Sequence, residues 1–347
     1  MILMFLNLQQ EMINRPHKIL KKLKIDKKKE SRKEIIEYKS NGHPDTLTDL
    51  CVEACASALD EYYLKKYGRV LHYNVDKAIF LAGDAKIWFG GGKIIKPPCF
   101  ILGGQVSNLT SELKRLLEET IKPTIKKHLP NLQYFNIEIR SGNISQNLGQ
   151  ISKDKRILSN DTSFGVGYYP YSSNELKVLK IKKELDKMIK MKEIPLGELY
   201  KILLTPKMIY ISAPLYAQKI SSHKEYVKFK KEIESKLSSY GKIIFNPDFE
   251  KGFPYLTLTG SSIECGDDGQ VGRSNRYNGL ITPCRPMTLE AFHGKNNRNH
   301  IGKLYSKWAF QMAKRIYKKT GKYTEVILVG KIGESIKKYE KYVFQNL

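Results

Sequence analysis

Helix-like and strand-like segments alternate along the whole chain, and this alternation constrains the fold more than any other feature of the sequence. A first helix is predicted to begin at Asp45, as its N-cap, and to end at Gly68. The next patterns predict strands at 77–82, 99–106 and 134–139 and a helix at 112–127. Because strands and helices interleave, the chain is predicted to be a mixed α/β protein.

The second half of the chain continues this alternation. Ser172 with Glu175, and Ser222 with Glu225, have the spacing of a capping box, which predicts two helices of about 18 residues each. The same kind of pattern predicts further strands and a last helix, at 208–212, 242–245, 255–259, 301–320 and 325–329.

Length and composition set the class of protein. The chain has 347 residues, of which 41% are hydrophobic, enough for two or three domains or one large one. Its five cysteines form no CxxC pair, which favours a reducing compartment, the cytoplasm. No apolar run reaches the roughly 20 residues of a membrane helix, so no membrane partner is predicted. Residues 1–38 are predicted to be a basic N-terminal extension, and residues 39–347 the folded region.

The net charge of +25 raises the hypothesis of a nucleic-acid partner. Residues 1–40 hold 11 basic and 5 acidic side chains, which leaves +19 spread over the other 307 positions. Most of the excess is lysine, and only 11 residues of the chain are arginine. A diffuse lysine excess is typical of solvated faces, so nucleic-acid binding is not favoured.

The stretch 260–279 carries the densest set of chemically active residues. Asp267 and Asp268 lie between glycines, in a backbone that must turn tightly or approach a ligand closely. One or two carboxylates together with phosphate oxygens make a typical Mg²⁺ site, and Arg273 and Arg276 could bind the same phosphates. The alternative interpretation is a solvated Asp-Gly turn.

A second polar stretch lies just before the last predicted helix. Lys295, Arg298 and His300 lie close together in sequence, and Asn299 is predicted to cap that helix. The free N–H groups at a helix N-terminus bind anions, so the stretch predicts a phosphate site. The alternative is that each basic residue is a surface charge.

Two shorter motifs leave their alternatives open. His43 and Asp45 flank a proline at the positive end of the first predicted helix, where they could bind a ligand or serve as turn residue and cap. Asp161, Ser163 and Phe164 combine a carboxylate, a hydroxyl and an aromatic ring between a strand and a helix. That second motif could hold a nucleoside or an amino group, or form only a turn.

Several common motifs are absent from the sequence. It has no GxxxxGK[ST] loop, no Rossmann glycine fingerprint and no GxSxG elbow. The predicted site therefore relies on metal and polyphosphate electrostatics, without an obvious covalent nucleophile.

Taken together, the motifs resemble the S-adenosylmethionine synthetase family, specifically its archaeal-type branch. The resemblance rests on six blocks in family order: GHPDTLTD (42–49), HYNVDK (72–77), FGGG (89–92), NDTSFGVGY (160–168), GDDGQVGRSNRYNGLITPCRPM (266–287) and GKNNRNHIGKLY (294–305). It implies a fold of three interleaved α/β subdomains with pseudo-threefold symmetry. It also implies a methionine adenosyltransferase that uses ATP and L-methionine, two Mg²⁺ ions and K⁺, and works as a homodimer or tetramer with active sites between subunits.

The resemblance also implies roles for individual residues. His43, Arg273, Lys295 and His300 would be catalytic and hold the triphosphate, and Asp267, Asp268, Arg276 and Arg298 would contribute to the same phosphate site. Asp161 would receive the methionine amino group, with Ser163 and Phe164 near the adenosine. The metal ligands would be Asp45, Asp76, Asp267 and Asp268.

Three positions depart from the family's motifs, namely Lys93, Gln105 and Tyr73. Lys93 stands where a carboxylate is expected, and Gln105 where an arginine is expected. These departures support a second hypothesis, in which the chain is a catalytically altered paralog that binds nucleotide or a partner subunit. The third hypothesis is the basic nucleic-acid-binding protein that the net charge suggests.

Overall fold

The computed structural model describes residues 34–153, 156–247 and 253–345. Most of the predicted extension, residues 1–38, lies outside the described residues. The strand β1 (Ile36–Lys39) spans the predicted boundary at residue 38, and it pairs with a strand from the middle of the chain. Residues 36–39 therefore belong to a sheet of the folded region.

The first hydrophobic core lies between a four-stranded sheet and two helices. The sheet has the order β16-β3-β6-β8, and its strands are Gly269–Gln270, Ala78–Leu81, Cys99–Leu102 and Asn136–Ile139. The helices are α3 (Pro44–Tyr67) and α4 (Ser111–His128). Apolar residues at every fourth position of α4 make one buried face: Leu113, Leu117, Ile121 and Ile125. That face packs against α3, whose own buried residues belong to the same core.

The second core is built in the same way. Its sheet has the order β1-β11-β12-β14, in which the new strands are Lys201–Leu204, Ile209–Ser212 and Ile243–Phe245. Helices α6 (Ser173–Met191) and α7 (His223–Leu237) contribute buried apolar faces to this core. Ser172 and Glu175 form the predicted capping box at the start of α6.

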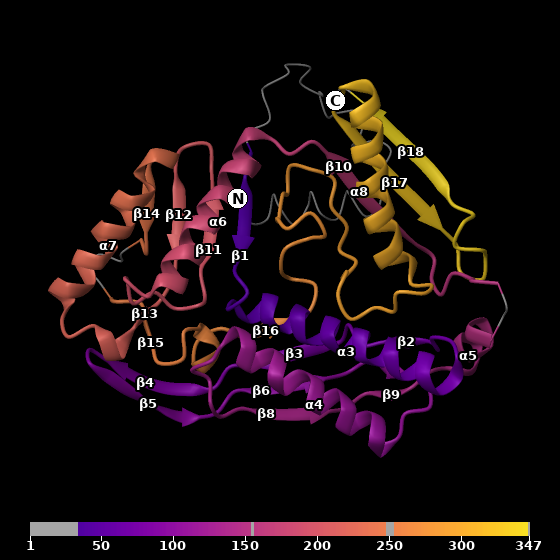
Figure 1. Cartoon of the computed structure of the whole chain (residues 1–347), viewed down its shortest axis with the longest axis horizontal. Coiled ribbons are helices and arrows are strands. Elements are labelled where there is room, and N and C mark those ends of the chain that lie inside the picture. Colours follow the sequence, from indigo (N-terminus) through magenta and orange to yellow (C-terminus); the bar gives the residue numbers. More distant parts are fainter. Residues whose placement is uncertain (1–33, 154–155, 248–252, 346–347) are drawn as a thin grey trace, which may run out of the picture. The chain divides into compact units, whose positions relative to one another are not determined.

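The third core brings together strands from distant parts of the chain. Strands β10 (Ser163–Tyr169), β17 (Thr324–Gly330) and β18 (Glu340–Gln345) form a sheet, and α8 (Ile301–Thr320) packs on it (Figure 1). A Cβ atom on Gly165 would lie 2.2 Å from the Ser306 nitrogen, and one on Gly167 would lie 2.2 Å from the Phe310 nitrogen. The two glycines thus let α8 approach the strand closely.

Smaller elements connect the three cores. The strands β2 (Tyr73–Asn74), β7 (Gln105–Val106) and β9 (Gly142–Asn143) form one small sheet, and β13 (Leu215–Tyr216) pairs with β15 (Leu256–Thr257). Phe89 and Gly90 make the turn of a hairpin between β4 (Asp84–Trp88) and β5 (Gly91–Lys96), and the other two glycines of the block 89–92 begin β5. The remaining elements are α5 (Gln146–Lys153) and the short 3₁₀ helices Ala217–Lys219, Ser238–Tyr240 and Ser262–Glu264.

The observed architecture confirms the predicted α/β class, but three local predictions were wrong. His43, not Asp45, is the N-cap of α3, because its Nδ1 accepts the backbone N–H of Asp45 at 3.2 Å. Asn299 does not cap α8. Its amide group instead donates to the carbonyl of Leu158, and His300 occupies the N-cap position. Residues 163–168 are not a loop but most of strand β10.

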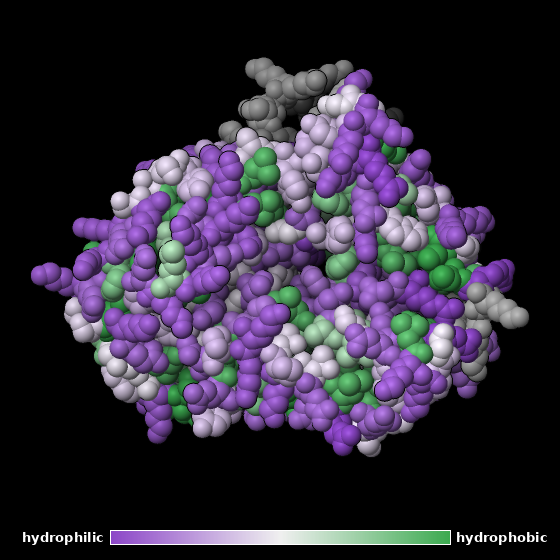
Figure 2. Space-filling view, in the orientation of Figure 1, coloured by the Kyte–Doolittle hydropathy of each residue, from purple (hydrophilic) through white to green (hydrophobic). Residues whose placement is uncertain are grey.

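Within the described residues, no helix has the length and apolarity that a membrane crossing needs. Figure 2 shows one face of the molecule, on which hydrophilic side chains are spread widely and a hollow lies near the centre of the view.

Candidate functional site

Three carboxylates on one face of α3 accept backbone hydrogen bonds from the segment 270–294, which contains many of the predicted site residues. Asp45, Asp49 and Glu53 are four residues apart, so their side chains lie one above another on the helix. Each accepts one backbone N–H from the loops between residues 269 and 294, donated by Gln270 at 2.9 Å, Gly272 at 2.9 Å and Gly294 at 3.1 Å respectively. We call these three residues the α3 carboxylate row.

The first charged cluster lies at the N-terminus of α3. His43 Nε2 is 3.8 Å from Asp267 Oδ2, and His43 Nδ1 is 3.9 Å from Asp45 Oδ2. The Lys39 ammonium binds Asp45 Oδ2 at 2.9 Å and also donates to the backbone carbonyl of Arg273 at 2.8 Å. The structure therefore brings together three of the predicted side chains here, those of His43, Asp45 and Asp267, next to the backbone of Arg273.

Burial controls the charge of His43. It lowers the pKa of the imidazole to about 4, more than the Asp45 carboxylate raises it, and the Lys39 ammonium lowers it further. His43 is therefore neutral at pH 7, and it can donate one hydrogen bond to a ligand without carrying a charge. The pKa of Asp267 is raised, first by burial and then by the neighbouring negative charge of Asp45.

The first cluster fits a hard divalent cation. Burial raises the pKa of Asp267 most and the negative charge of Asp45 raises it further, and a bound cation would relieve the repulsion between these two carboxylates. Asp268 is already engaged, because its Oδ1 accepts the backbone N–H of Ala82 at 2.7 Å. No group of three or more His, Cys, Asp or Glu side chains arranged for a metal occurs within 34–153, 156–247 and 253–345. Mg²⁺ held here would therefore need phosphate oxygens as further ligands.

The second charged cluster surrounds Lys295, which is only 3% exposed. Its ammonium forms an ion pair with Glu290 and lies 3.6 Å from Asp76 Oδ2. Asp161 belongs to the same cluster. Burial raises the pKa of Asp161, the charges of Glu290 and Asp76 raise it further, and the Lys295 ammonium lowers it. The predicted metal ligand Asp76 thus has lysine partners, since its Oδ1 also accepts from Lys77 at 2.7 Å.

An ion pair between the buried Lys303 and the partly exposed Glu53 fixes the backbone at Lys295. The Lys303 ammonium binds Glu53 Oε1 at 2.6 Å and Oε2 at 2.8 Å, and it donates to the Lys295 carbonyl at 3.0 Å. Gly294 has a φ of +77°, and a Cβ there would lie 2.9 Å from the Val75 carbonyl oxygen. Glu53, Lys303 and Gly294 together determine where Lys295 projects.

Two buried histidines lie near the start of α8. His300 and His72 are each 3% exposed, and among the described residues neither Nδ1 has a hydrogen-bond partner. Burial lowers both pKa values, that of His72 to about 4, and the Lys295 charge lowers that of His300 further. Both imidazoles are therefore neutral at pH 7.

The other predicted site residues are placed differently. The Arg276 guanidinium donates to the backbone carbonyls of Gly272 and Ser274. Its Nε and Nη2 groups are therefore bonded within its own loop. Arg298 donates to the carbonyl of Val70, beyond the end of α3, a helix about 36 Å long. The structure therefore does not bring Arg298 next to His43.

Ser163 and Phe164 begin strand β10, opposite Gly330 and Val329 of β17. The Phe164 ring is 42% exposed, so it is available to a ligand or a partner surface. Asp161 lies two residues before this strand, which places the three predicted substrate-binding residues at one end of the third sheet.

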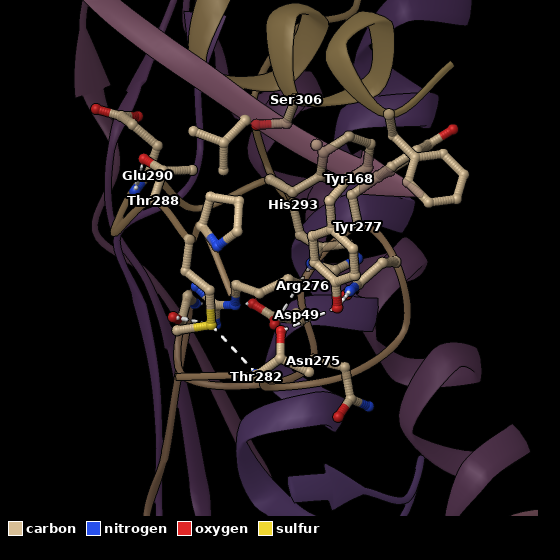
Figure 3. A pocket seen from close by; sticks show the side chains of 18 residues that line it. Asp49, Tyr168, Asn275, Arg276, Tyr277, Thr282, Thr288, Glu290, His293 and Ser306 are labelled. Atoms are coloured by element: carbon tan, nitrogen blue, oxygen red, sulfur yellow. Dashed lines mark hydrogen bonds and ion pairs between the residues drawn. The ribbon is translucent and has the colours of Figure 1, made fainter. Parts of the chain in front are cut away.

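A small cavity of about 40 Å³ lies between α3, β10, α8 and the loop 272–293 (Figure 3). Asp49, the middle member of the α3 carboxylate row, lines it, and so does Glu290 of the second cluster. The cavity is therefore lined by the segment 272–293, which connects the first charged cluster to the second.

Sequence reasoning missed several residues of the site. Asp49 and Glu53 could have been found, because three carboxylates at intervals of four on a predicted helix mark one face. The charges of Lys39 and Lys201 lower the pKa values of both His43 and Asp267. These two lysines lie on paired strands, β1 and β11, that are far apart in the sequence. No local pattern marks those two lysines.

The fold and the two charged clusters define an α/β protein in which buried carboxylates and ammonium groups are gathered along one stretch of polypeptide. A solved structure described as an unusual S-adenosylmethionine synthetase from Campylobacter jejuni matches 89% of this chain and 80% of its own, with a TM-score of 0.58 at 16% sequence identity. The chain thus has the fold of an S-adenosylmethionine synthetase.

Sequence comparison shows the family to which the chain belongs. The S-adenosylmethionine synthetase (AdoMet synthetase) family model matches residues 18–344. An S-adenosylmethionine synthase of Sulfurisphaera tokodaii is 35% identical over 87% of this chain and 83% of the relative. Another from Pyrococcus furiosus is 34% identical over 89% and 88%. The chain belongs to the S-adenosylmethionine synthetase family, which confirms the resemblance in the motifs.

The ion pair between the buried Lys303 and the partly exposed Glu53 leads to a stability prediction. Replacing Lys303 by Met removes the ammonium from the Glu53 carboxylate, which keeps only its bond from the Gly294 N–H and some contact with water, so we expect the free energy of unfolding to fall by about 2 kcal/mol. Urea unfolding measures this, with Lys338→Met as control. Lys338 pairs with Glu334 on the surface at 3.0 Å, and its loss should cost no more than about 0.5 kcal/mol. Equal effects of the two substitutions would contradict this view of the site.

The buried His72 leads to a pH prediction. Its folded pKa of about 4 lies below the ordinary 6.5, so between these values the unfolded chain binds the extra proton. Stability from this group is complete above pH 6.5 and is lost as the pH falls toward 4. Between pH 7 and pH 5, the wild type should lose about 2 kcal/mol more than His72→Gln in urea unfolding. Parallel losses in the two proteins would show that His72 titrates normally.

Proposed function

We propose that the chain is a methionine adenosyltransferase, which joins L-methionine to ATP. The methionine sulfur attacks the ribose C5′, S-adenosylmethionine forms, and the triphosphate leaves and is then cleaved to pyrophosphate and phosphate. One observation supports the proposal most strongly. In a chain of this family, the two charged clusters lie at the two ends of the stretch 270–294, whose backbone is bonded to the α3 carboxylate row.

Attack by a neutral thioether needs no enzyme nucleophile, but the leaving group carries several negative charges. Lys39, Lys201 and neutral His43 would stabilise it at the first cluster, and Lys295 and neutral His300 at the second. His43, Lys295 and His300 are buried and Lys39 is nearly so. These groups are already oriented, so they lose little energy in rearranging as charge develops.

Asp161 is the group we assign to the methionine ammonium. Its raised pKa reflects burial among carboxylates, and a cationic amino group would relieve the repulsion from Glu290 and Asp76. Phe164, three residues further along the chain, offers an exposed ring face for the adenine.

Asp45 and Asp267 would hold Mg²⁺, together with the phosphates. Bound Mg²⁺ would neutralise phosphate charge in the leaving group. The family resemblance implies a second Mg²⁺ and K⁺ as well, for which we assign no separate ligands.

We further propose a homodimer, or a tetramer built from it, with active sites at the subunit interface. Strand β18 lies at the edge of the third sheet and exposes three large apolar side chains: Tyr342, Val343 and Phe344. An exposed apolar edge strand favours burial against another chain. Phe164, on β10 of the same sheet, is also exposed.

None of the five cysteines, all within the described residues, forms a disulfide, which supports a reducing compartment such as the cytoplasm. The altered-paralog hypothesis is not favoured by the comparisons, although Lys93 and Gln105 keep it testable. Gln105 pairs with Asn74 in the small sheet, and Asn74 forms a bridge with Lys295.

The activity is tested by supplying ATP, methionine, Mg²⁺ and K⁺ and measuring S-adenosylmethionine, pyrophosphate and phosphate. We expect the three products in equal amounts, and at least a hundredfold loss of kcat in Lys295→Met, because a buried cation facing the leaving group is lost. The exposed lysine variant Lys338→Met serves as the control with unchanged activity.

Absence of S-adenosylmethionine over a wide range of K⁺ and pH would reject the proposal. Activity that appears only after Lys93→Glu and Gln105→Arg would instead favour the altered paralog.

A further inference from the structure

The carboxylate of Glu290 covers the Lys295 ammonium. The side chains of Lys295 and Asp76 are each 3% exposed, whereas that of Glu290 is 28% exposed. Glu290 therefore forms its ion pair with Lys295 from the solvent side, while Asp76 lies 3.6 Å from the same ammonium in the interior. An anion that arrives from solvent meets Glu290 before it meets Lys295.

Glu290 also lies at the first turn of α8. A Cβ atom on Gly302, the second residue of this helix, would lie 2.6 Å from Glu290 Oε2 and 3.3 Å from Lys295 Nζ. The free N–H groups of a first helical turn and a buried ammonium both attract anions. A side chain of the protein itself thus occupies the position that the sequence predicted for phosphate.

The two carboxylates next to this ammonium differ in their freedom to leave it. Asp76 is buried and lies two residues before β3. Glu290 belongs to the loop 283–293, which contains no helix or strand, and its neighbour Leu289 is 96% exposed. Figure 3 shows Glu290 beside Thr288 of the same loop, whose hydroxyl accepts the Glu290 backbone N–H at 3.1 Å. Glu290 can therefore move away without disturbing a regular element.

Competition of this kind weakens phosphate binding in a defined way. Lys295 can accept a phosphate only in the fraction of molecules in which Glu290 has left it, so the apparent Kd rises by the reciprocal of that fraction. The same competition favours product release, because Glu290 can return to the ammonium as a phosphate leaves. In the free protein Glu290 also spares a buried cation from depending on the more distant Asp76 alone.

We propose that Glu290 is an internal competitor of the substrate phosphates at Lys295. It covers the ammonium in the free protein, leaves when phosphate binds and returns when phosphate dissociates. The inference rests on the proposed function, because it takes Lys295 as a phosphate-binding residue. It assigns to Glu290 a part in the binding and release of polyphosphate, separate from the methionine recognition assigned to Asp161.

Calorimetric titration of the full chain with tripolyphosphate and with pyrophosphate, at one fixed Mg²⁺ concentration, tests this inference. Glu290→Gln keeps the size of the side chain and removes its charge. We expect this variant to bind both anions about tenfold or more tightly than the wild type, and by similar factors, because both anions must displace Glu290. In a Lys295→Met background the same substitution should change binding by less than about threefold, because no ammonium is left to cover.

Two control variants separate competition from a general change of charge. Asp161→Asn removes a carboxylate of the same cluster that forms no ion pair with Lys295 in the described part of the chain, so it should tighten binding by less than about threefold. Glu334→Gln removes a carboxylate that pairs with Lys338 on the surface, and it should change nothing. No gain in Glu290→Gln, or an equal gain in Asp161→Asn, would overturn the inference.

A crystal structure of the wild type with tripolyphosphate gives a second readout, which serves if Glu290→Gln does not fold. We expect a phosphate oxygen bonded to Lys295 Nζ and the Glu290 carboxylate turned away. Phosphate bound at Lys295 while Glu290 keeps its ion pair would contradict the inference. Neither experiment needs turnover, so a chain that forms no S-adenosylmethionine can still confirm the inference, and an active chain can still refute it.

Discussion

The α3 carboxylate row is the interaction on which the rest of the site depends. A long loop carrying glycines and charged residues has no regular hydrogen bonding of its own, so its backbone N–H groups need other acceptors. Asp45, Asp49 and Glu53 provide them at intervals of one helical turn. A helix is rigid over this distance, so the bonds to α3 fix the position of the loop.

Each member of the row also carries a second function. Asp45 faces His43 and Lys39, Asp49 reaches the cavity, and Glu53 binds the buried Lys303 ammonium. Placing charges in this interior is unfavourable unless they are paired. The cost is offset by ion pairs and backbone bonds that also orient the groups, which is how a protein without a nucleophile can prepare a site for an anionic leaving group.

The sequence predicted the fold class and most long elements, because helices such as Ser111–His128 have strong periodicity and clear caps. It failed where tertiary pairing decides the structure. Strand β11 was not predicted, although it supplies Lys201, and residues 163–168 seemed a loop because their glycines suit close packing as well as turns. The six motifs located the site, but the distances between clusters and the role of Asp49 depend on contacts more than 200 residues apart.

The most direct measurement is a crystal structure with a non-hydrolysable ATP analogue, methionine and Mn²⁺ in place of Mg²⁺. We expect an anomalous peak from Mn²⁺ that is bound by Asp45 or Asp267 and by phosphate oxygens, with the Lys295 ammonium against the same triphosphate. A nucleotide bound away from the α3 carboxylate row, or Mn²⁺ held by neither aspartate, would contradict this expectation.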